Sequence, residues 1–445
     1  MLTSIVLWFL ASVVLSLSVT VEAKVVYVQP GGNDNYTGLS WDQAKLTVQA
    51  GLNTAGVNDQ VWVAAGTYNE RITLKADVAL YGGFAGMETD LSQRNIAANP
   101  TILDGQQGGS VVTSPTGADN TTRIDGFTIK NGIGTLANGY LYGGGIYCNS
   151  SSPTISNNTI SGNSANNAVG GGIYCNSSSP TISNNTISGN NNTNGYGGGI
   201  FCDNSSSPTI SNNLINGNIA TYTGGGIDCR YSSPTINNNT IRGNSTNRGG
   251  GIYCYYSSPT ISNNTISGNI ATNGSGIYCQ NSSPTIANNI IAVNGTGIYK
   301  YPGSGTPVLR NNCVFNLTYD YSGLSAGTTD IQQDPLFVSL VGSDFHLTSS
   351  SPCINAGNDT DVQAGWLDMD GQIRIYSSHV DIGADEFYPA GDCDGDGHVT
   401  EADLLIVLNS MDISAGDTGY DGRADLDGDG SITSTDISIV LTNME

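Results

Sequence analysis

Two acidic loops near the carboxyl end of the chain have residue types and spacing that suit a metal ion. The first runs from Asp392 to Asp403 and the second from Asp425 to Asp436. Hard divalent cations prefer oxygen ligands, and a twelve-residue loop can supply them from positions 1, 3, 5, 7, 9 and 12. Position 6 must turn sharply and is glycine in both loops. The residues at the ligand positions are Asp392, Asp394, Asp396, His398, Thr400, Asp403, Asp425, Asp427, Asp429, Ser431, Thr433 and Asp436. We therefore predict two calcium ions, one in each loop.

The loops belong to a distinct acidic tail, residues 389–445. From Asp392 to Glu445 there are thirteen acidic residues against the single Arg423, so this stretch contributes −12 to a net charge of −23. An apolar stretch follows each loop, at Leu404–Leu408 and Ile437–Leu441, and we predict both as helices. An acidic, solvated tail would not explain why glycine and apolar positions recur in both loops.

This tail resembles a type I dockerin. It has two loop-then-helix units 33 residues apart, with aspartate at position 12 and no helix ahead of either loop. The resemblance implies a protein partner, a cohesin-type domain on a scaffold or a cell surface. Loop positions 10 and 11 are Glu401-Ala402 and Ser434-Thr435, which differ from each other, and basic residues common in the following helix are missing. The choice of cohesin is therefore open.

A second group that could do chemistry lies in the middle of the chain. Asp228 and Arg230 are two residues apart, and Asp203 lies one repeat earlier. One hypothesis is an acid–base centre of a polysaccharide lyase or glycoside hydrolase; the alternative is a surface ion pair worth at most about 1 kcal/mol. Inverting hydrolases need two carboxylates about 6.5–9.5 Å apart. The repeats contain no histidine, and no lyase pattern matches residue by residue, so enzymatic activity stays open. The acids and the arginine of the amino-terminal loops are a further alternative: Asp104, Asp119, Asp125 and Arg123.

These residues interrupt a row of aromatic side chains. The row holds Tyr147, Tyr174, Phe201, Tyr253, Tyr278 and Tyr299, with Tyr255 two residues after Tyr253. Alternation along a strand directs this row outward, between an inward isoleucine and an inward cysteine. Exposed aromatic rings either stack on one another or bind a partner, and tyrosine suits the C–H faces of sugars. Mutual stacking and a carbohydrate-binding strip are both open.

A block that repeats every 23 to 28 residues positions these side chains. It extends from about Gly143 to Asn312, and one copy reads GGGIYCNSSSPTISNNTISGN. Three short alternating pieces separated by Gly, Asn, Ser and Pro indicate three strands per repeat. Self-similarity at this period indicates a stacked fold, in which neighbouring coils pair in parallel. We predict an all-β, right-handed parallel β-helix with equivalent residues about 4.8 Å apart in columns.

Two further columns follow from this stacking. The cysteines after each isoleucine are predicted to point inward as a buried, mainly reduced column, although the spacing permits some disulfides between coils. Paired asparagines, such as Asn157–Asn158, fall at a corner where asparagine tolerates left-handed geometry and stacked amides can bond. We favour a structural role over a row of sugar-binding amides.

The start of the chain differs from the repeats. Residues 1–23 have an apolar run and small residues before position 24, which is typical of a secretory signal peptide; a retained membrane anchor is the rival. Residues 24–110 are predicted to form the cap and first coils, with an amphipathic helix over Trp41–Leu52 capped by Ser40. Strands are expected at Val25–Val28, Gln60–Ala64, Arg71–Leu74, Val78–Tyr81 and Thr101–Leu103.

The segment from Ala64 to Leu74, with Tyr81–Phe84 and Leu103–Gly105, resembles secreted bacterial β-helix proteins of the pectate-lyase-like superfamily. The resemblance covers about a third of the chain ahead of the tail and implies fold alone, because the superfamily holds many activities. Residues 111–388 are predicted as repeats and carboxy-terminal coils. The pieces after Gln332 resemble the last coils of secreted β-helix proteins that carry interchangeable surface anchors. Asp368–Gly371 is expected to be a tight turn rather than a calcium loop.

The leading hypothesis is a secreted, extracellular protein that binds, and in one version cleaves, a polysaccharide along the coils and attaches to a cohesin through its tail. The alternative is a non-catalytic structural or adhesive protein of the cell surface. Nucleic-acid binding is disfavoured by the net charge of −23. No membrane span is expected in the mature chain.

Overall fold

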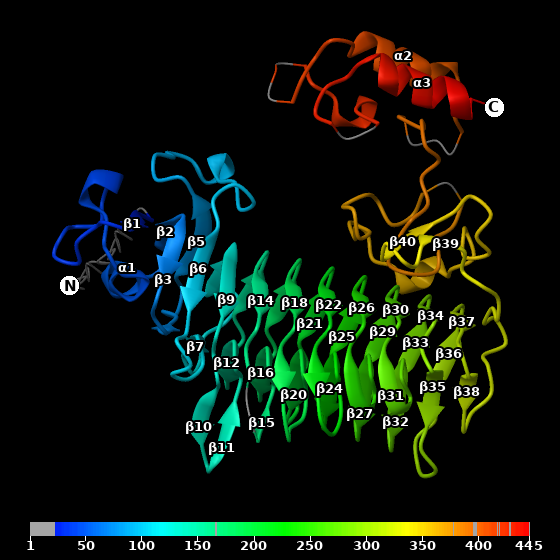
Figure 1. The fold of residues 1–445 in the computed structure, drawn as a ribbon, viewed down its shortest axis with the longest axis horizontal. Helices are drawn as coiled ribbons and strands as arrows, with labels where there is room; N and C mark the ends of the chain where they lie inside the picture. The colour runs from blue at the N-terminus through cyan, green and yellow to red at the C-terminus, as the bar shows by residue number, and fades with distance from the viewer. Residues whose placement is uncertain are drawn as a thin grey trace, which may run out of the picture.

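Three parallel sheets wind around one axis in the computed structural model, which describes residues 23–164, 167–376, 378–394, 398–415, 417, 419–426 and 429–444 (Figure 1). The predicted signal peptide therefore lies, except for Ala23, outside the described residues. Each repeat contributes one strand to each sheet, and every pairing within the three sheets is parallel. Apart from one register shift between Trp62 and Ala64, the pairs stay in register; Cys148 pairs with Cys175, and Cys175 pairs with Cys202. The predicted three-stranded coil is confirmed.

The strands fall into three long sheets and a short rim. Sheet A holds β1 (Val25–Val28), β2 (Gln60–Ala64), β5 (Ala79–Phe84), β8 (Arg123–Asp125), β13 (Thr154–Ser156), β17 (Thr181–Ser183), β21 (Thr209–Ser211), β25 (Thr235–Asn237), β29 (Thr260–Ser262), β33 (Thr285–Ala287) and β36 (Val308–Arg310). Sheet B holds β3 (Gly66–Tyr68), β6 (Thr101–Asp104), β9 (Phe127–Lys130), β14 (Thr159–Ser161), β18 (Thr186–Ser188), β22 (Leu214–Asn216), β26 (Thr240–Arg242), β30 (Thr265–Ser267), β34 (Ile290–Ala292) and β37 (Cys313–Phe315). Sheet C holds β4 (Ile72–Thr73), β7 (Val112–Ser114), β12 (Ile146–Asn149), β16 (Ile173–Asn176), β20 (Ile200–Asp203), β24 (Ile227–Arg230), β28 (Ile252–Tyr255), β32 (Ile277–Gln280), β35 (Thr296–Lys300) and β38 (Tyr319–Ser322). The rim strands precede those of sheet C and are β10 (Thr135–Ala137), β11 (Tyr140–Tyr142), β15 (Ala168–Val169), β19 (Asn191–Asn192), β23 (Ile219–Ala220), β27 (Ser245–Arg248) and β31 (Ile270–Asn273).

Columns of small apolar side chains fill the interior. The inward isoleucines of all three sheets and the repeat cysteines are buried in one continuous cluster. All nine cysteines are free and buried. Burial of such side chains, each worth about 1.5–3 kcal/mol, holds the coils together.

Asparagine columns satisfy the polar groups at the corners. The first asparagine of each pair has a φ of 51–56°, which is the left-handed geometry predicted for the turn. The second is buried and bonds to the next coil: Asn185 Nδ2 donates to Asn213 Oδ1 over 3.0 Å, and Asn213 Nδ2 donates likewise to Asn239. A third column, which includes Asn190 and Asn218, does the same at the next corner and was not predicted. These amides are structural.

The amino-terminal helix is shorter than predicted. A 3-10 turn, η1 (Trp41–Gln43), is followed by extended residues, and α1 spans Val48–Thr54 with Thr47 rather than Ser40 as its N-cap. The interruption arises because Lys45 pairs with β1: its N–H donates to Tyr27 O over 2.9 Å. Val48 and Leu52 are nonetheless buried against the first coils, as expected of a cap.

The segment after Gln332 forms no further coils, which corrects the prediction of carboxy-terminal coils. It folds back along the outside of the stack and contains the antiparallel pair β39 (Phe337–Ser339) and β40 (Asp344–Leu347) (Figure 1). We call residues 333–388 the flank. It docks here because two outward side chains of β34, Ile290 and Ala292, are apolar and pack against Leu347 and Ile382 of the flank. The equivalent residues of the neighbouring strand β30 are threonine and serine.

Candidate functional site

The predicted aromatic row exists, but most of it is buried. Tyr147 stacks on Tyr174 with ring centroids 5.7 Å apart, and Tyr174 stacks on Phe201 at 5.9 Å. Beyond the gap at Asp228, Tyr253, Tyr278 and Tyr299 stack in turn at 5.2 and 4.9 Å. Exposure was therefore predicted wrongly for the four buried members, which are Tyr174, Phe201, Tyr253 and Tyr278. Mutual stacking, one of the two interpretations, accounts for them.

The rim buries this row. Residues just ahead of each sheet C strand lie over its outward side chain, and the close approach requires glycine. A Cβ on Gly197 would lie 2.8 Å from the Cβ of Phe201, and Gly197 has a φ of +68°. Tyr142 covers the next coil similarly, with its ring 4.8 Å from that of Tyr174.

Asp228 and Arg230 form a buried ion pair rather than the surface pair considered from sequence. Arg230 Nε donates to Asp228 Oδ1 over 3.1 Å, and Asp228 is fully buried. The Thr223 hydroxyl donates to the other carboxylate oxygen and accepts from Arg230 Nη2 over 2.6 Å. Burial raises the pKa of Asp228 and outweighs the opposing effect of Arg230. Both carboxylate oxygens of Asp228 are hydrogen-bonded, and a ligand outside the coil cannot reach them. The role of Asp228 is therefore to position Arg230.

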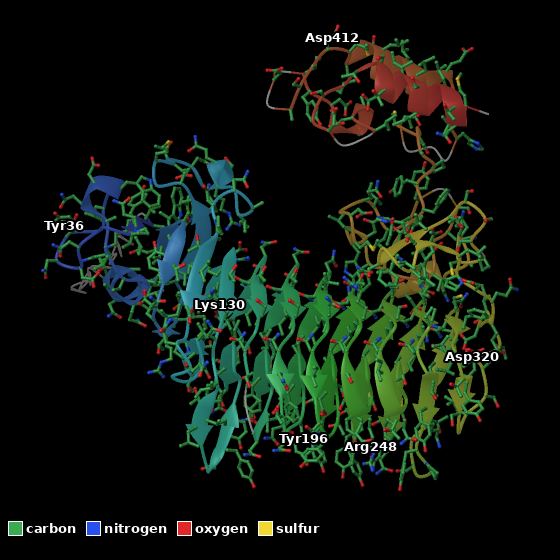
Figure 2. All side chains as sticks on the ribbon, viewed as in Figure 1. Tyr36, Lys130, Tyr196, Arg248, Asp320 and Asp412 are labelled. Carbon is green, nitrogen blue, oxygen red and sulfur yellow. The ribbon has the colours of Figure 1, made fainter. Side chains whose placement is uncertain are left out.

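Arg230 in turn forms the centre of a groove along the outer side of sheet C. Its guanidinium lies 4.1 Å from the ring centroid of Tyr196 and 5.5 Å from that of Phe201. A hollow of about 630 Å³ lies to one side and another of about 390 Å³ to the other, and both are lined by Tyr196, Arg230 and Tyr255. The two hollows therefore form one aromatic groove across several coils. Tyr196 and Arg248, which lines the smaller hollow, lie along the same edge in Figure 2.

The groove brings together most of the predicted binding residues. Its larger hollow contains Tyr147, Tyr174, Phe201, Asp203, Arg230 and Tyr255, and its smaller one contains Tyr253. Tyr278 and Tyr299 continue the stack but line neither hollow. Tyr231 and Tyr256 stack at 5.5 Å beside Tyr255, where both are about half exposed.

Sequence reasoning missed the groove residues that come from the rim. Tyr142 and Tyr196 precede the first glycine of their repeats, in segments of variable length, so no fixed spacing links them. The structure aligns this position as its own column: Tyr196 bridges to Val169 on one side and Thr223 on the other. Counting backward from the glycine triplet would have found it.

Asp203 is the one carboxylic acid among the described residues that line the groove. It is half-buried, and burial raises its pKa against the opposing bond from Asn204 N–H and the charge of Arg230. The acids of the first coils are occupied elsewhere. Asp125, for example, is buried and pairs with Arg94 at 2.6 Å and Arg123 at 3.3 Å. The described lining of the groove therefore offers no pair of carboxylates, whereas in the first coils the exposed Asp119 and the partly exposed Asp77 both bond to the Thr121 hydroxyl.

The helices predicted after the two acidic loops of the tail are present and start earlier than expected. The helices are α2 (Glu401–Asn409) and α3 (Ser434–Asn443), and their apolar sides share a small core with Cys393 and Ile432. Thr400 and Thr433 are the N-caps, with hydroxyls that accept from Ala402 and Thr435 N–H.

The first loop gathers its acids. Ligand atoms of Asp392, Asp394 and Asp403 lie within 4.8 Å of one another. Burial alone would raise the pKa of Asp403, but N–H groups of Thr400, Asp394 and Cys393 donate to its carboxylate, and the net pKa is lowered. Asp403 is therefore ionised at neutral pH, as a calcium ligand must be.

The second loop also fits a cation. Asp425 Oδ1 is buried without a hydrogen-bond partner, whereas Oδ2 accepts from Gly430 N–H over 2.9 Å. An orphaned carboxylate oxygen is costly unless a cation meets it. Asp436 accepts from Leu426 N–H, and Asp429 from Ser431 N–H. His398 and Ser431 are described, whereas Asp396 and Asp427 lie outside the described residues.

Comparisons with known proteins agree with these domains. Residues 214–332 match the family described as right handed beta helix region, residues 390–444 match the dockerin type I domain, and residues 30–224 match a protein family of unknown function, DUF1565. None of the curated proteins compared matches the chain. Among the described residues, no helix has the length and apolar character to cross a membrane.

Solved structures with a similar course of the chain include proteins whose titles name a pectate lyase and a pectin methylesterase. The pectate lyase Pel9A is 16% identical over 82% of this chain and 96% of its own, with a TM-score of 0.46. A pectin methylesterase from Aspergillus niger is 15% identical over 79% and 97%, with a TM-score of 0.36. XylC in complex with xylose is 10% identical over 68% and 86%, with a TM-score of 0.34. Likeness at this level carries no chemistry from one chain to the other. The protein is a right-handed parallel β-helix protein with a carboxy-terminal type I dockerin domain.

Proposed function

We propose that this protein is an extracellular polysaccharide-binding protein, whose groove along sheet C holds the glycan and whose dockerin, loaded with two calcium ions, attaches it to a cohesin. The observation that carries the proposal is the groove itself: two hollows joined through Tyr196, Arg230 and Tyr255. A dockerin implies a cohesin partner, and dockerin proteins are typically extracellular. The predicted signal peptide at residues 1–23 supports export.

The chemistry of the groove suits a sugar chain. Tyr255 is half-buried and Tyr231 is about half exposed, so their rings offer faces to the C–H faces of sugar rings. Arg230 and Asp203 supply charged donors and acceptors for hydroxyl groups beside those rings. The groove crosses several coils, which suits a polymer of several residues rather than a single small molecule.

Binding without cleavage is the version that the geometry favours. Glycoside hydrolysis uses two carboxyl groups that flank the bond, about 5–9.5 Å apart. Asp203 is accessible, but Asp228 is buried beneath Arg230 with both oxygens occupied. We therefore propose Asp203 and Arg230 as ligand-binding residues and Asp228 as a positioning residue.

A non-catalytic structural or adhesive role on the cell surface, in which the coils set length, is the alternative function. A glycan array with parallel detection of reducing ends and unsaturated products separates the candidates. The groove hypothesis predicts that at least one polysaccharide binds, that no product forms, and that Tyr255→Ala loses affinity. Tyr36→Ala, at an exposed tyrosine of the amino-terminal region, is the matched control (Figure 2). If no glycan binds, the structural alternative stands; product formation would reinstate the enzyme.

The buried members of the row are poor probes. Tyr253 is 4% exposed, and Asp228 is fully buried, so alanine at either position would disturb the fold as well as the groove. Tyr255 separates the two effects. Each aromatic contact is worth about 0.5–1.5 kcal/mol, so we expect its loss to weaken binding by up to about tenfold.

Calcium-dependent capture of a panel of cohesins tests the attachment separately. The proposal predicts that at least one cohesin retains the full chain in calcium and releases it after chelation. If no cohesin in a broad panel binds the calcium-loaded chain, this half of the proposal fails while the groove is unaffected.

A further inference from the structure

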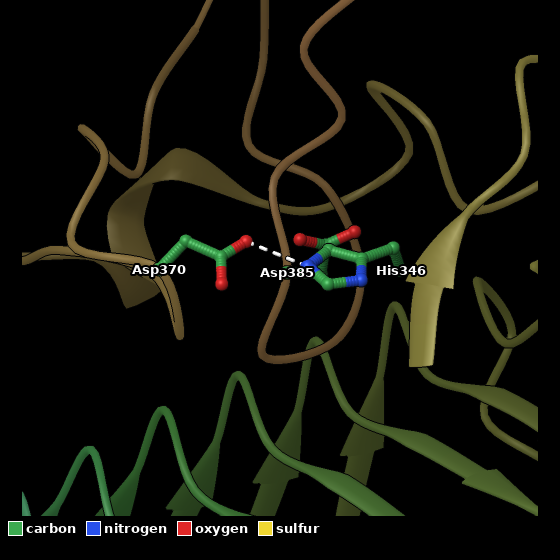
Figure 3. A group of neighbouring side chains, drawn as sticks. All are labelled: His346, Asp370 and Asp385. Carbon is green, nitrogen blue, oxygen red and sulfur yellow. Dashed lines mark hydrogen bonds and ion pairs between the residues drawn. The ribbon is translucent and has the colours of Figure 1, made fainter. Parts of the chain in front are cut away.

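The flank carries a second site, away from the groove, built around a histidine. His346 on β40, Asp370 and Asp385 have ligand atoms within 4.8 Å of one another. Figure 3 shows Asp370 pointing at the imidazole, with Asp385 beside it. His346 Nε2 lies 2.7 Å from Asp370 Oδ2. One imidazole nitrogen and two carboxylates form a ligand set of the kind that binds divalent transition metals.

The other side of the imidazole is fixed. His346 Nδ1 bonds to the carboxylate of Asp344, its neighbour two residues earlier on the strand. When Nδ1 donates in this way, the lone pair of the neutral ring is on Nε2, which is the atom that faces Asp370 and Asp385. A carboxylate behind a histidine is the usual orienting partner of a metal-binding imidazole. Asp385 is held as well, since its Oδ2 accepts from Leu347 N–H over 2.8 Å.

The charge of the region also calls for a cation. Four carboxyl groups of the flank are each no more than 2% exposed, and the buried cation among them is Arg374. The four acids are Asp368, Asp381, Asp385 and Glu386. Each buried ion carries a desolvation penalty of several kcal/mol unless it is paired.

An adjoining pocket contains an independent sign of a missing ligand. His346 and Asp370 line a pocket of about 410 Å³ together with Asn238 and Arg242. The side chain of Asn238 is 2% exposed, and neither its Oδ1 nor its Nδ2 has a hydrogen-bond partner. An unsatisfied buried amide costs about 1–3 kcal/mol.

Neighbours in the same asparagine column show what Asn238 lacks. Asn263 Nδ2 donates to Asp361 O and Asn288 Nδ2 donates to Asn358 O, each over 3.0 Å, so the flank satisfies both. Asn238 receives no such bond from the described part of the flank, although its amide is closed off from solvent and the residue lines the pocket beside His346 and Asp370.

We propose that His346, Asp370 and Asp385 bind one divalent transition-metal ion, of which zinc is the probe, with the remaining coordination positions open to the pocket of Asn238. Asp344 orients the imidazole. The metal takes the place of the direct contact between His346 Nε2 and Asp370 Oδ2, and its charge compensates that of Asp385. This site is independent of the groove and of the dockerin loops.

The test uses the full chain, stripped of metal and then held in excess calcium so that the dockerin loops do not take up zinc. After incubation with zinc and desalting, metal content is measured by mass spectrometry, and the thermal midpoint of the β-helix is recorded with and without zinc. The wild-type chain is expected to retain one zinc ion and to melt at a higher temperature with it.

Two variants and a matched control locate the ion. Asp370→Asn and His346→Gln should each weaken zinc binding at least about tenfold and abolish the thermal shift. Asp370 and His346 are both 44–45% exposed at the side chain, so folding should survive these changes. His379→Gln is the control, because His379 pairs with Asp359 at 3.0 Å in the same flank but outside this ligand group. Failure of the wild type to retain zinc would overturn the proposal, as would equal retention by Asp370→Asn; the group would then be an ion-pair latch.

Discussion

The Nε atom of Arg230 lies 3.1 Å from Oδ1 of a fully buried Asp228, and the guanidinium extends from there over the ring of Tyr196. The pair replaces one aromatic member of the stacked row and places a cation in the middle of the groove. The coil after it has Tyr253 and Tyr255 at the same two positions. The fold therefore accommodates either an ion pair or two tyrosines at these two positions. The ion pair in this coil gives the middle of the groove its positive charge.

Removal of Asp228 alone should strongly lower the free energy of unfolding. Asp228→Ala leaves Arg230 beside the rings without its carboxylate, and breaking a buried pair in this way costs about 3–5 kcal/mol. The double variant Asp228→Tyr with Arg230→Tyr copies the next coil and should lie within about 2 kcal/mol of the wild type. Urea denaturation of the wild type, the single variant and the double variant measures both changes in the free energy of unfolding. Equal stability of the single variant and the wild type would show that the pair is not buried in solution.

The same carboxyl group should make stability depend on pH. Burial raises the folded-state pKa of Asp228 above its unfolded value of about 3.9. Its contribution to stability is therefore greatest below that value and is lost as the pH rises through the folded-state pKa. As the pH rises above about 3.9, the wild type should lose stability relative to Asp228→Asn, which cannot ionise. A difference in urea midpoint that stays constant across this range would contradict the assigned direction.

The asparagine columns should contribute measurably to the rod. Asn213 donates to Ile182 O and to Asn239, and it accepts from Asn185, so alanine leaves several buried groups unsatisfied. We expect Asn213→Ala to lower the free energy of unfolding by about 1–3 kcal/mol. Thr209→Ala, at an exposed position of the same coil, should change it by no more than about 0.5 kcal/mol. If both variants matched the wild type, the column would be incidental to stability.

Calcium removal should unfold the dockerin alone. Chelation leaves Asp392, Asp394 and Asp403 as crowded like charges, so the helical circular-dichroism signal of α2 and α3 should fall while the β-helix transition stays in place. Asp403→Ala and Asp436→Ala should each remove one calcium ion in a calorimetric titration. A chelated chain that took up no calcium would end this assignment.

The buried cysteine column predicts a thiol count. Every cysteine is free and buried, so thiol titration should find few reactive groups in the native chain and all nine after denaturation without reductant. The contact with the Cys279 sulfur and burial raise the pKa of Cys254, which keeps this thiol protonated and slows its oxidation. A substantially lower count in the denatured chain would reveal disulfides between coils.

The sequence predicts the coil well, because identical letters at a near-constant period leave little choice of register. It places Ile146 and Cys148 inward and Asn157 in left-handed geometry, all as found. It fails where tertiary contacts decide. Burial of Tyr174 depends on Tyr142, which belongs to a rim segment of variable length. The shortened helix near Val48 depends on one pairing of Lys45 with β1.

The flank shows the same limit more strongly. Motifs such as Asp344–Leu347 and Val380–Phe387 look like further coil strands, and two outward apolar residues of β34 turn them into a layer on the side of the stack. The group of His346, Asp370 and Asp385 spans 40 residues of that layer, and no local spacing reveals it. Only the folded chain brings these ligands together.

Hydrogen–deuterium exchange on the calcium-loaded full chain, with and without the polysaccharide selected from the array, tests the central claim most directly. The account predicts protection in peptides that contain Tyr196, Arg230 and Tyr255, with the flank and the outer faces of sheets A and B unchanged. Protection confined to any other face, with these three peptides unaffected at saturating glycan, would contradict it.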